Sequence, residues 1–482
     1  MDKTKKSIIS GMFWKFSERM AAQLVSLIVT IVLARLLLPS DYGAVSLVTI
    51  FITISNVFVS DGFGSALIQK KDADQVDFST VFYFSIVFSV IVYGLIFIIA
   101  PVVADFYELP ILTPVLRVLA IKVPIAAMNS VQQAYVSRNM LFKRFFYSTL
   151  IGTIISAVVG IALAYKGFGV WALVAQYLTN TIIDTLVLWF TVRWRPELVF
   201  SIKRLTTLFS YGWKLLVQSL IVTLYGNLRS LLIGKFYTTE DLAFYTKGSY
   251  YPNLIVVNVD SAMSAALFPA MAKEQMSKER VKSIARRATK LCSYIMSPLL
   301  IGFAVCADTF VMLCLTEKWL PIVPYVRIIC VGLLFRAAQT ATLQAMKAVG
   351  KSDYVLKIDI PVRIFGVSVV LITMKLGVIY VAISEILVAI FGLLLYSYAC
   401  NKVVKYSIKE IFSDFIGNVF IAMLMGGIVY FIPFIIAVSP LMLLILQIVV
   451  GAIAYLAISH IMHNENYLYI VGEIKGILDK KA

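Results

Sequence analysis

Basic side chains interrupt the long apolar runs of this sequence, in positions where they could bind an anionic group. In the first run, Lys15 and Arg19 share a helical face with Ser26 and Thr30, because residues three to four positions apart lie on one side of an α-helix. A charge at the centre of a bilayer costs about 2.5–3.5 kcal/mol on insertion scales. Arginine matches phosphate oxygens with a planar fork, and lysine acts as a point charge. The pattern therefore predicts a cationic binding site.

A second stripe of the same kind occurs about 200 residues later, where Lys214, Gln218, Tyr225 and Arg229 fall on one face. We expect the two stripes to line a wet cavity between two halves of the protein, which would suit a pyrophosphate on a polyprenyl tail or acidic sugars. The alternative is that some of these lysine and arginine side chains extend along the helix to the lipid head groups, as we expect for Arg35. The predicted cavity bases are Lys15, Arg19, Arg117, Lys122, Lys214, Arg229, Lys247, Arg336 and Arg363.

Acidic residues in the apolar runs form a second candidate set. Asp61 and Asp260 occupy matching positions, and each is followed by a serine four residues later. One hypothesis is that one of them carries a coupling proton or sodium ion, or forms a latch between helices. The alternative is a structural carboxylate that caps or hydrogen-bonds a neighbouring helix. Glu18 and Glu385 are further candidates, and Glu18 could instead neutralise a nearby base.

The composition is that of a membrane protein. Of 482 residues, 60% are hydrophobic and 14% are charged, whereas soluble chains are about 45–50% apolar and about 25% charged. Five cysteines without paired spacing and two histidines near the end argue against a disulfide framework and a metal centre. We expect no metal and no cofactor.

Stretches of about 20 mostly apolar residues predict transmembrane helices. Fourteen such stretches lie at 11–37, 43–67, 79–104, 114–137, 145–165, 169–192, 207–234, 241–270, 286–311, 322–347, 354–374, 377–400, 412–436 and 440–461. Basic residues gather in alternate connections, so the positive-inside rule places both termini in the cytoplasm. The net charge of +17 is then largely an orientation signal, and nucleic acid is not expected as a partner.

An internal repeat with an offset of about 200–208 residues divides the chain. FWKF at 13–16 pairs with GWKL at 212–215, and DYGAVSL from Asp41 pairs with DLAFYTK from Asp241. DGFGSALIQ from Asp61 pairs with DSAMSAALF from Asp260, and GVWALVA from Gly169 with GVIYVAI from Gly377. The offset spans six helices, an arrangement typical of alternating-access transporters. We expect an all-α polytopic membrane protein with lobes at 1–200 and 201–408, followed by two extra helices and a cytoplasmic tail at 409–482.

Several motifs resemble the polysaccharide-exporter branch of the multidrug/oligosaccharidyl-lipid/polysaccharide exporter superfamily, of the lipopolysaccharide or O-antigen type. They are ARLLLPSDYG at 34–43, GFGVWALVAQ at 167–176, LFPAMAK at 267–273, LTEKWLPIVPYVRII at 315–329 and LQAMKAVGKSDYVLK at 343–357. The resemblance implies two six-helix lobes and a flippase of lipid-linked oligosaccharides in the bacterial inner membrane, with membrane lipids around it.

Other functions fit the sequence less well. DAD at 72–74 matches a metal-binding pattern of some glycosyltransferases, but it lies in a short loop beside no nucleotide-binding domain, so we expect no enzyme activity. The sequence contains no nucleotide-binding P-loop, so an ion or substrate gradient must supply any work. A drug/ion antiporter of the same superfamily is the main alternative, although cationic stripes would repel organic cations. A non-transporting scaffold would leave the charges in the apolar runs unexplained.

Overall fold

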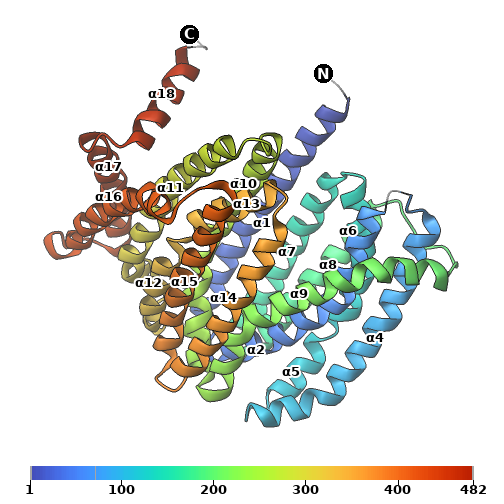
Figure 1. The fold of residues 1–482 in the computed structure, drawn as a ribbon. Coiled ribbons are helices and arrows are strands. Elements are labelled where there is room, and N and C mark those ends of the chain that lie inside the picture. The colour runs from blue at the N-terminus through green and yellow to red at the C-terminus, as the bar shows by residue number, and fades with distance from the viewer. Residues whose placement is uncertain (1–2, 71, 480–482) are drawn as a thin grey trace. The chain divides into compact units, whose positions relative to one another are not determined.

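The protein is built from helices, as the sequence predicts. The computed structural model describes residues 3–70 and 72–479, apart from the side chains of residues 3–13, 15–19, 60–63, 65, 211, 352 and 473–479. No strand occurs within these described ranges, and all fourteen predicted spans are helical (Figure 1). The chain divides into two compact units, residues 1–243 (unit 1) and 244–482 (unit 2). The lobe boundaries at residues 200 and 408 stay predictions.

Unit 1 contains a bundle in which α7 packs against α1 and α8, while α9 contacts α2, α3 and α4 (Figure 1). Its elements are α1 (Lys3–Leu36), α2 (Pro39–Asn56), η1 (Val57–Asp61), α3 (Gly62–Gln69), α4 (Gln75–Phe106), α5 (Leu112–Leu119), α6 (Lys122–Arg138), α7 (Phe142–Tyr165), α8 (Val170–Thr191) and α9 (Ile202–Phe236).

Unit 2 is built around α11, which contacts α12, α13, α16 and α17. Its elements are α10, which starts in unit 1 (Thr239–Lys273), α11 (Lys278–Cys314), η2 (Glu317–Ile322), α12 (Val323–Leu333), α13 (Arg336–Ala348), α14 (Ser352–Thr373), α15 (Val378–Val404), α16 (Ile408–Ile435), α17 (Pro440–Ile461) and α18 (Glu465–Asp479). The last two predicted spans are α16 and α17, and α18 follows as an additional helix in the predicted tail.

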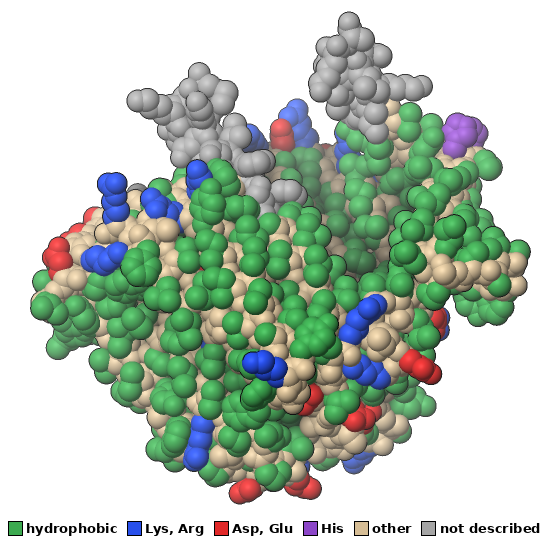
Figure 2. All heavy atoms as spheres, turned by 180° about the vertical axis from the view of Figure 1, so that it is seen from behind, with side chains coloured by type: hydrophobic (Ala, Val, Ile, Leu, Met, Phe, Trp, Pro, Cys, Tyr) green, Lys and Arg blue, Asp and Glu red, His purple; other side chains and the backbone are tan. Residues whose placement is uncertain are grey.

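Most of the helices are suited to a bilayer. Within the described residues, twelve spans are long and apolar enough to cross a membrane, and Met20–Leu36 forms a shorter apolar segment. Helix α14 is not among the twelve, because Lys357, Asp359 and Arg363 interrupt its apolar sequence. Hydrophobic side chains cover much of the face shown in Figure 2. The fourteen spans of the prediction are thus an approximate count.

A π-helix interrupts one of the predicted spans. η1 is a turn of π-helix between α2 and α3, whereas α10 runs as a continuous α-helix through the matching sequence. Twenty residues separate Asp41 from Asp61, but only nineteen separate Asp241 from Asp260. A π-bulge accommodates one extra residue within an α-helix. η1 therefore accounts for the difference in length between the two matching segments.

Ionic contacts join the start of α9 to the start of α4 in unit 1. Arg204 lies 2.6 Å from Asp74 and 3.3 Å from the buried Asp77, which also pairs with Lys70 at 2.6 Å. Asp74 and Asp77 cap α4 reciprocally, because each side chain accepts a hydrogen bond from the other's backbone N–H. The hydrogen bond from Arg204 lowers the pKa of the Asp74 carboxyl below its ordinary value.

A buried carboxylate attaches α16 to α11 in unit 2. Asp414 on α16 is 4% exposed and accepts two hydrogen bonds from Arg286 on α11, at 2.8 and 2.9 Å. The Tyr406 hydroxyl donates a third hydrogen bond to Asp414, at 2.8 Å. One turn further on, Asn418 donates to the Lys290 carbonyl and to Ser293 on α11. These contacts fix the first of the two extra helices to the rest of unit 2.

Gly43 should be essential to the packing of unit 1. A Cβ atom there would lie 1.9 Å from the Thr239 carbonyl oxygen, which belongs to the backbone and cannot swing away. We expect Gly43→Ala to lower the free energy of unfolding by about 2–3 kcal/mol, measured by thermal unfolding of the purified protein in detergent. Gly226 on α9 is the matched control, because nothing lies within 4 Å of its added Cβ. Gly226→Ala should stabilise the helix by about 0.5–1 kcal/mol. Equal effects at the two sites would show that the Thr239 carbonyl does not restrict residue 43.

Candidate functional site

Two predicted site residues meet in unit 2. Arg336 at the start of α13 donates hydrogen bonds from Nε and Nη2 to one carboxylate oxygen of Asp260 on α10, at 3.3 and 3.2 Å. The Thr340 hydroxyl, one turn along α13, donates to the other oxygen of Asp260. The sequence predicted both charged residues as site candidates, and the structure makes them partners.

A second acid–hydroxyl pair lies near this cluster. The Tyr396 hydroxyl on α15 donates a hydrogen bond to Asp359 on α14, and both Arg336 and Arg363 lie within electrostatic reach of Tyr396. Helices α10, α13 and α14 therefore bring two arginines and two aspartates into one region, and α15 adds the Tyr396 hydroxyl. Sequence reasoning missed Asp359, although its position four residues before Arg363 places the two on one face of α14.

Arg336 keeps the capacity to bind a further anion. Its side chain is 50% exposed, whereas that of Asp260 is 20% exposed. A guanidinium carries five N–H donors, and among the described residues the hydrogen bonds of Arg336 go to Asp260 alone, from two of its three nitrogens. The donors that remain face a partly open environment. Arg336 can thus bind a phosphate-like group either in place of the Asp260 carboxylate or in addition to it.

Lys122 is the corresponding charged residue in unit 1. It begins α6, and its Nζ lies 5.3 Å from the centre of the Tyr177 ring on α8. No carboxylate of the described chain lies within 4.0 Å of this ammonium group, which is partly buried in a predicted span. An aromatic face stabilises a cation without neutralising it. Lys122 therefore carries a net positive charge that a substrate anion could neutralise.

The other predicted bases of unit 1 have varied surroundings. Arg117 on α5 donates to the Phe97 carbonyl at 3.1 Å and lies 4.2 Å from the centre of the Phe97 ring, so it joins α5 to α4. Lys214 is exposed on α9, and Arg229 on the same helix is partly buried. The cavity role of all three stays a prediction. Lys15, Glu18, Arg19 and Asp61 lie outside the residues whose side chains the structure describes.

Lys247 and Glu385 are further predicted site residues of unit 2. The Nζ of Lys247 on α10 lies 5.7 Å from the centre of the Tyr250 ring. Glu385 on α15 accepts a hydrogen bond from the buried Tyr245 hydroxyl on α10. This contact makes Glu385 a link between α15 and α10. Its coupling role stays a prediction.

A carboxylate that sequence reasoning did not single out lies within unit 1. Asp184 on α8 accepts a hydrogen bond of 2.8 Å from Asn129, which is 4% exposed on α6. Asn180, one turn before Asp184, donates to Ser156 on α7. The sequence signal for this site was that Asp184 is the one charged residue in its predicted span. Among the described residues, no group of three or more His, Cys, Asp or Glu is placed to hold a metal ion.

An apolar cavity of about 660 Å³ opens among α10, α11, α16 and α17. Its walls include Pro298 and Phe303 on α11, Met425 on α16 and Ile448 on α17. Gln447 and Tyr455 are among the few polar side chains, and glycines on α11 and α17 leave space in the wall because they carry no side chain. A cavity with such walls inside membrane-spanning helices suits a hydrocarbon chain.

The Asp260–Arg336 pair should contribute measurably to stability. We expect Asp260→Asn to lower the free energy of unfolding by about 1 kcal/mol, because it removes the charge that Arg336 and Thr340 stabilise while Arg336 remains half in contact with solvent. Asp308, which pairs with Arg327 elsewhere in unit 2, is the matched control because its side chain is 56% exposed. Asp308→Asn should cost about 0.5 kcal/mol or less. Thermal unfolding in detergent measures both, and a larger loss at Asp308 would refute this ranking.

Solved structures with the same arrangement of helices identify the fold. The lipid II flippase MurJ in an inward closed conformation superposes with a TM-score of 0.74 at 13% sequence identity, covering 94% of this chain and 99% of that one. An inward-facing multidrug resistance MATE family transporter of the MOP superfamily has a TM-score of 0.60 at 18% identity, covering 80% of this chain and 96% of that one. At these identities, the likeness establishes the fold and confirms the predicted fold class.

Sequence relatives span nearly the same length. The teichuronic acid biosynthesis protein TuaB of Bacillus subtilis (strain 168) is 23% identical over 465 residues, covering 95% of this chain and 96% of TuaB. The lipopolysaccharide biosynthesis protein WzxC of Escherichia coli (strain K12) is 22% identical over 400 residues, covering 81% of this chain and 80% of WzxC. The profile of the polysaccharide biosynthesis protein family matches residues 32–324, more than half of the chain. The chain therefore belongs to the polysaccharide biosynthesis protein family.

Proposed function

We propose that this protein is a flippase that moves a polyprenyl-pyrophosphate-linked oligosaccharide or polysaccharide precursor across the bacterial inner membrane. It carries the precursor from the cytoplasmic to the outer leaflet by alternating access, and an ion gradient supplies the work. No covalent step forms part of this proposal. Membership of the polysaccharide biosynthesis family supports it, together with relatives that act in teichuronic acid and lipopolysaccharide biosynthesis.

The observation that carries the proposal is a lysine in a membrane-spanning helix that has no acidic partner among the described residues. Lys122 has an aromatic ring beside it and no carboxylate within 4.0 Å among the described residues. Such a charge is expensive in hydrocarbon and marks a binding site or an ion pathway. A pyrophosphate supplies the missing negative charge. We assign the phosphate-binding role in unit 1 to Lys122 and in unit 2 to Arg336.

The lipid part of the substrate requires a separate surface. A polyprenyl tail is an apolar chain that forms no hydrogen bonds. It therefore needs a binding surface of aliphatic and aromatic side chains from which water is excluded. The cavity among α10, α11, α16 and α17 supplies such a wall over about 660 Å³. In our proposal, the tail lies in this cavity while its pyrophosphate contacts basic side chains. This assignment gives a role to the two helices that follow the repeat.

The distribution of basic residues among the connections between helices supports an orientation of the protein in the membrane. The connections between α6 and α7 and between α15 and α16 are basic, with Arg138, Lys143, Lys402 and Lys405 in or beside them. Connections at the other ends, such as the one between α7 and α8, carry few charges. We propose that the basic ends face the cytoplasm, with both termini on that side of the inner membrane.

Removing the charge of Lys122 should impair transport. In cells that lack the native gene, Lys122→Gln should clear lipid-linked sugar from the inner leaflet about tenfold more slowly than wild type, because one ionic contact with phosphate is lost. Lys122→Arg should retain most of the activity. Lys166→Gln is the matched control, since Lys166 is exposed in the loop after α7. Protein amounts in the membrane must be equal, and wild-type clearance by Lys122→Gln would overturn the assignment.

Asp260 is the residue that we propose to link transport to an ion. Ionophores that collapse the proton or sodium gradient should slow the wild-type protein, whereas Asp260→Asn should transport at a reduced rate that no longer depends on either gradient. Asp308→Asn should keep the wild-type response, because its exposed pair with Arg327 lies outside the cluster. Intact gradient dependence in Asp260→Asn would remove Asp260 from the coupling step without affecting the Lys122 assignment.

A further inference from the structure

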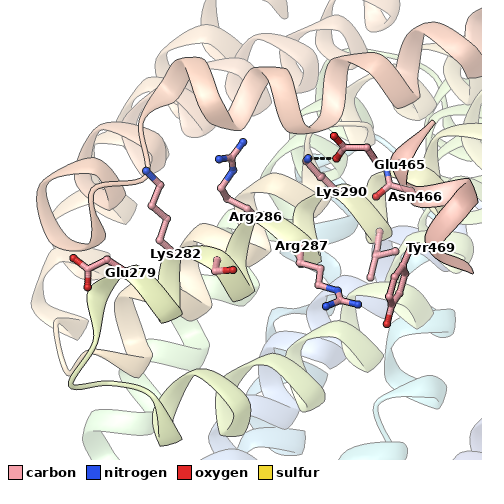
Figure 3. Close-up of a pocket in the computed structure, with 10 residues that line it drawn as sticks. Glu279, Lys282, Arg286, Arg287, Lys290, Glu465, Asn466 and Tyr469 are labelled. Atoms are coloured by element: carbon pink, nitrogen blue, oxygen red, sulfur yellow. Dashed lines mark hydrogen bonds and ion pairs between the residues drawn. The ribbon is translucent and has the colours of Figure 1, made fainter. Parts of the chain in front are cut away.

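A polar hollow occurs in unit 2 where α11 and α18 begin. It encloses about 480 Å³ (Figure 3). Four bases from successive turns of α11 line it, together with the first residues of α18. The lining includes Lys282, Arg286, Arg287, Lys290, Glu465 and Tyr469. The function proposed above makes no use of this hollow.

The four bases differ in how far they are neutralised. Lys282 pairs with Glu410 at 2.7 Å and Arg286 with the buried Asp414 at 2.8 Å. Arg287 is different, because no carboxylate of the described chain lies within 4.0 Å of it. Its guanidinium lies 4.0 Å from the centre of the Tyr469 ring and points toward that ring (Figure 3). Arg287 thus keeps its full charge and donors that an anion can use.

Lys290 has a partner that can be exchanged. Its Nζ lies 2.6 Å from Glu465 and 3.8 Å from Asp414. The Glu465 side chain is 78% exposed, and ion pairs of such exposed groups contribute little to stability. The Glu465 carboxylate therefore occupies the place beside Lys290 that an external anion could take. Asn464 caps the start of α18 by accepting from the Asn466 N–H at 2.9 Å, so α18 does not depend on Glu465 for its cap.

The surroundings of the hollow favour a lipid over a soluble anion. Leu291 forms part of the wall, and Ile461, Met462 and Leu468 at the junction of α17 and α18 are 74%, 48% and 49% exposed. Helix α11 runs on from the four bases into a membrane-spanning segment. A basic cluster next to exposed apolar side chains at the end of such a segment matches a charged head group with its acyl chains.

We propose that this hollow binds the phosphate of an anionic glycerophospholipid from the adjoining leaflet. Arg287 and Lys290 contact the phosphate, and the Glu465 carboxylate moves away from Lys290 as the head group enters. The lipid's acyl chains then lie along the exposed apolar residues at the α17–α18 junction. Binding is thus a competition between a protein carboxylate and a lipid phosphate for the same lysine.

Lipid titration of the purified full-length protein tests this site. The probe is phosphatidylglycerol added to protein in phosphatidylcholine nanodiscs, with bound lipid counted by native mass spectrometry. Arg287→Gln should weaken phosphatidylglycerol binding about tenfold, because it removes a charged hydrogen-bond donor. Glu465→Gln should strengthen binding, because the competing carboxylate is gone. Arg280→Gln is the matched control on the same helix, since Arg280 pairs with Glu274 and does not line the hollow.

Each result decides for or against the proposal. Unchanged phosphatidylglycerol binding in Arg287→Gln, or weaker binding in Glu465→Gln, would overturn the site. An equal effect of Arg280→Gln would show a diffuse surface charge instead. Inorganic phosphate forms a separate arm, and a site filled by phosphate at the same concentration would be a free-anion site and not a lipid site. Should Arg287→Gln fail to fold, the gain in Glu465→Gln still decides, because that variant leaves every base in place.

Discussion

A charged group that is largely buried needs a partner, and this requirement organises the polar contacts inside the protein. Asp414 receives three hydrogen bonds, and Asp260 receives contacts from both Arg336 and Thr340. The arginine contacts join helices that are far apart in the sequence. These ionic and hydrogen-bonded contacts add to the close apolar packing that joins the helices. Carboxylates therefore mark two of the places where helices of unit 2 meet, α10 with α13 and α11 with α16.

The same requirement suggests which basic side chains could bind a phosphate. In unit 2, two of the bases that we propose to bind phosphate already pair with a carboxylate, Arg336 with Asp260 and Lys290 with Glu465. In our proposal, a phosphate that takes the place of the carboxylate would change the contacts between helices as it binds. Lys122 in unit 1 has an aromatic ring instead, and an anion can join it without displacing a carboxylate. The sites that we propose would thus recognise an anion in two ways, by replacing a carboxylate or by adding to a base that has none beside it among the described residues.

The helices are predictable from the sequence because apolar length is a local property. Fourteen spans could be found by counting, and Asp260 and Arg336 stood out as charges within them. Their contact could not be predicted, since 76 residues separate them and the helical period says which residues share a face but not which faces meet. Asp359 and its partner Tyr396 were missed for the same reason. Arg117 shows the converse case, because its partner is a backbone carbonyl, which no sequence pattern marks.

The π-turn at Val57–Asp61 interrupts the α-helical hydrogen bonding of one half of the repeat, whereas the matching stretch of the other half is α-helical and contains Pro252. An extra residue in a regular α-helix would rotate the following residues by about 100° around the helix axis. A π-helical turn accommodates the extra residue, so the following residues keep their angular position around the axis. Asp61 and Asp260 can therefore keep the same angular position although their segments differ in length. A turn whose hydrogen bonds depart from the α pattern is also where a rod bends most easily. Each half thus has its own bending point along this segment, a widened turn in the first and the missing backbone N–H of Pro252 in the second.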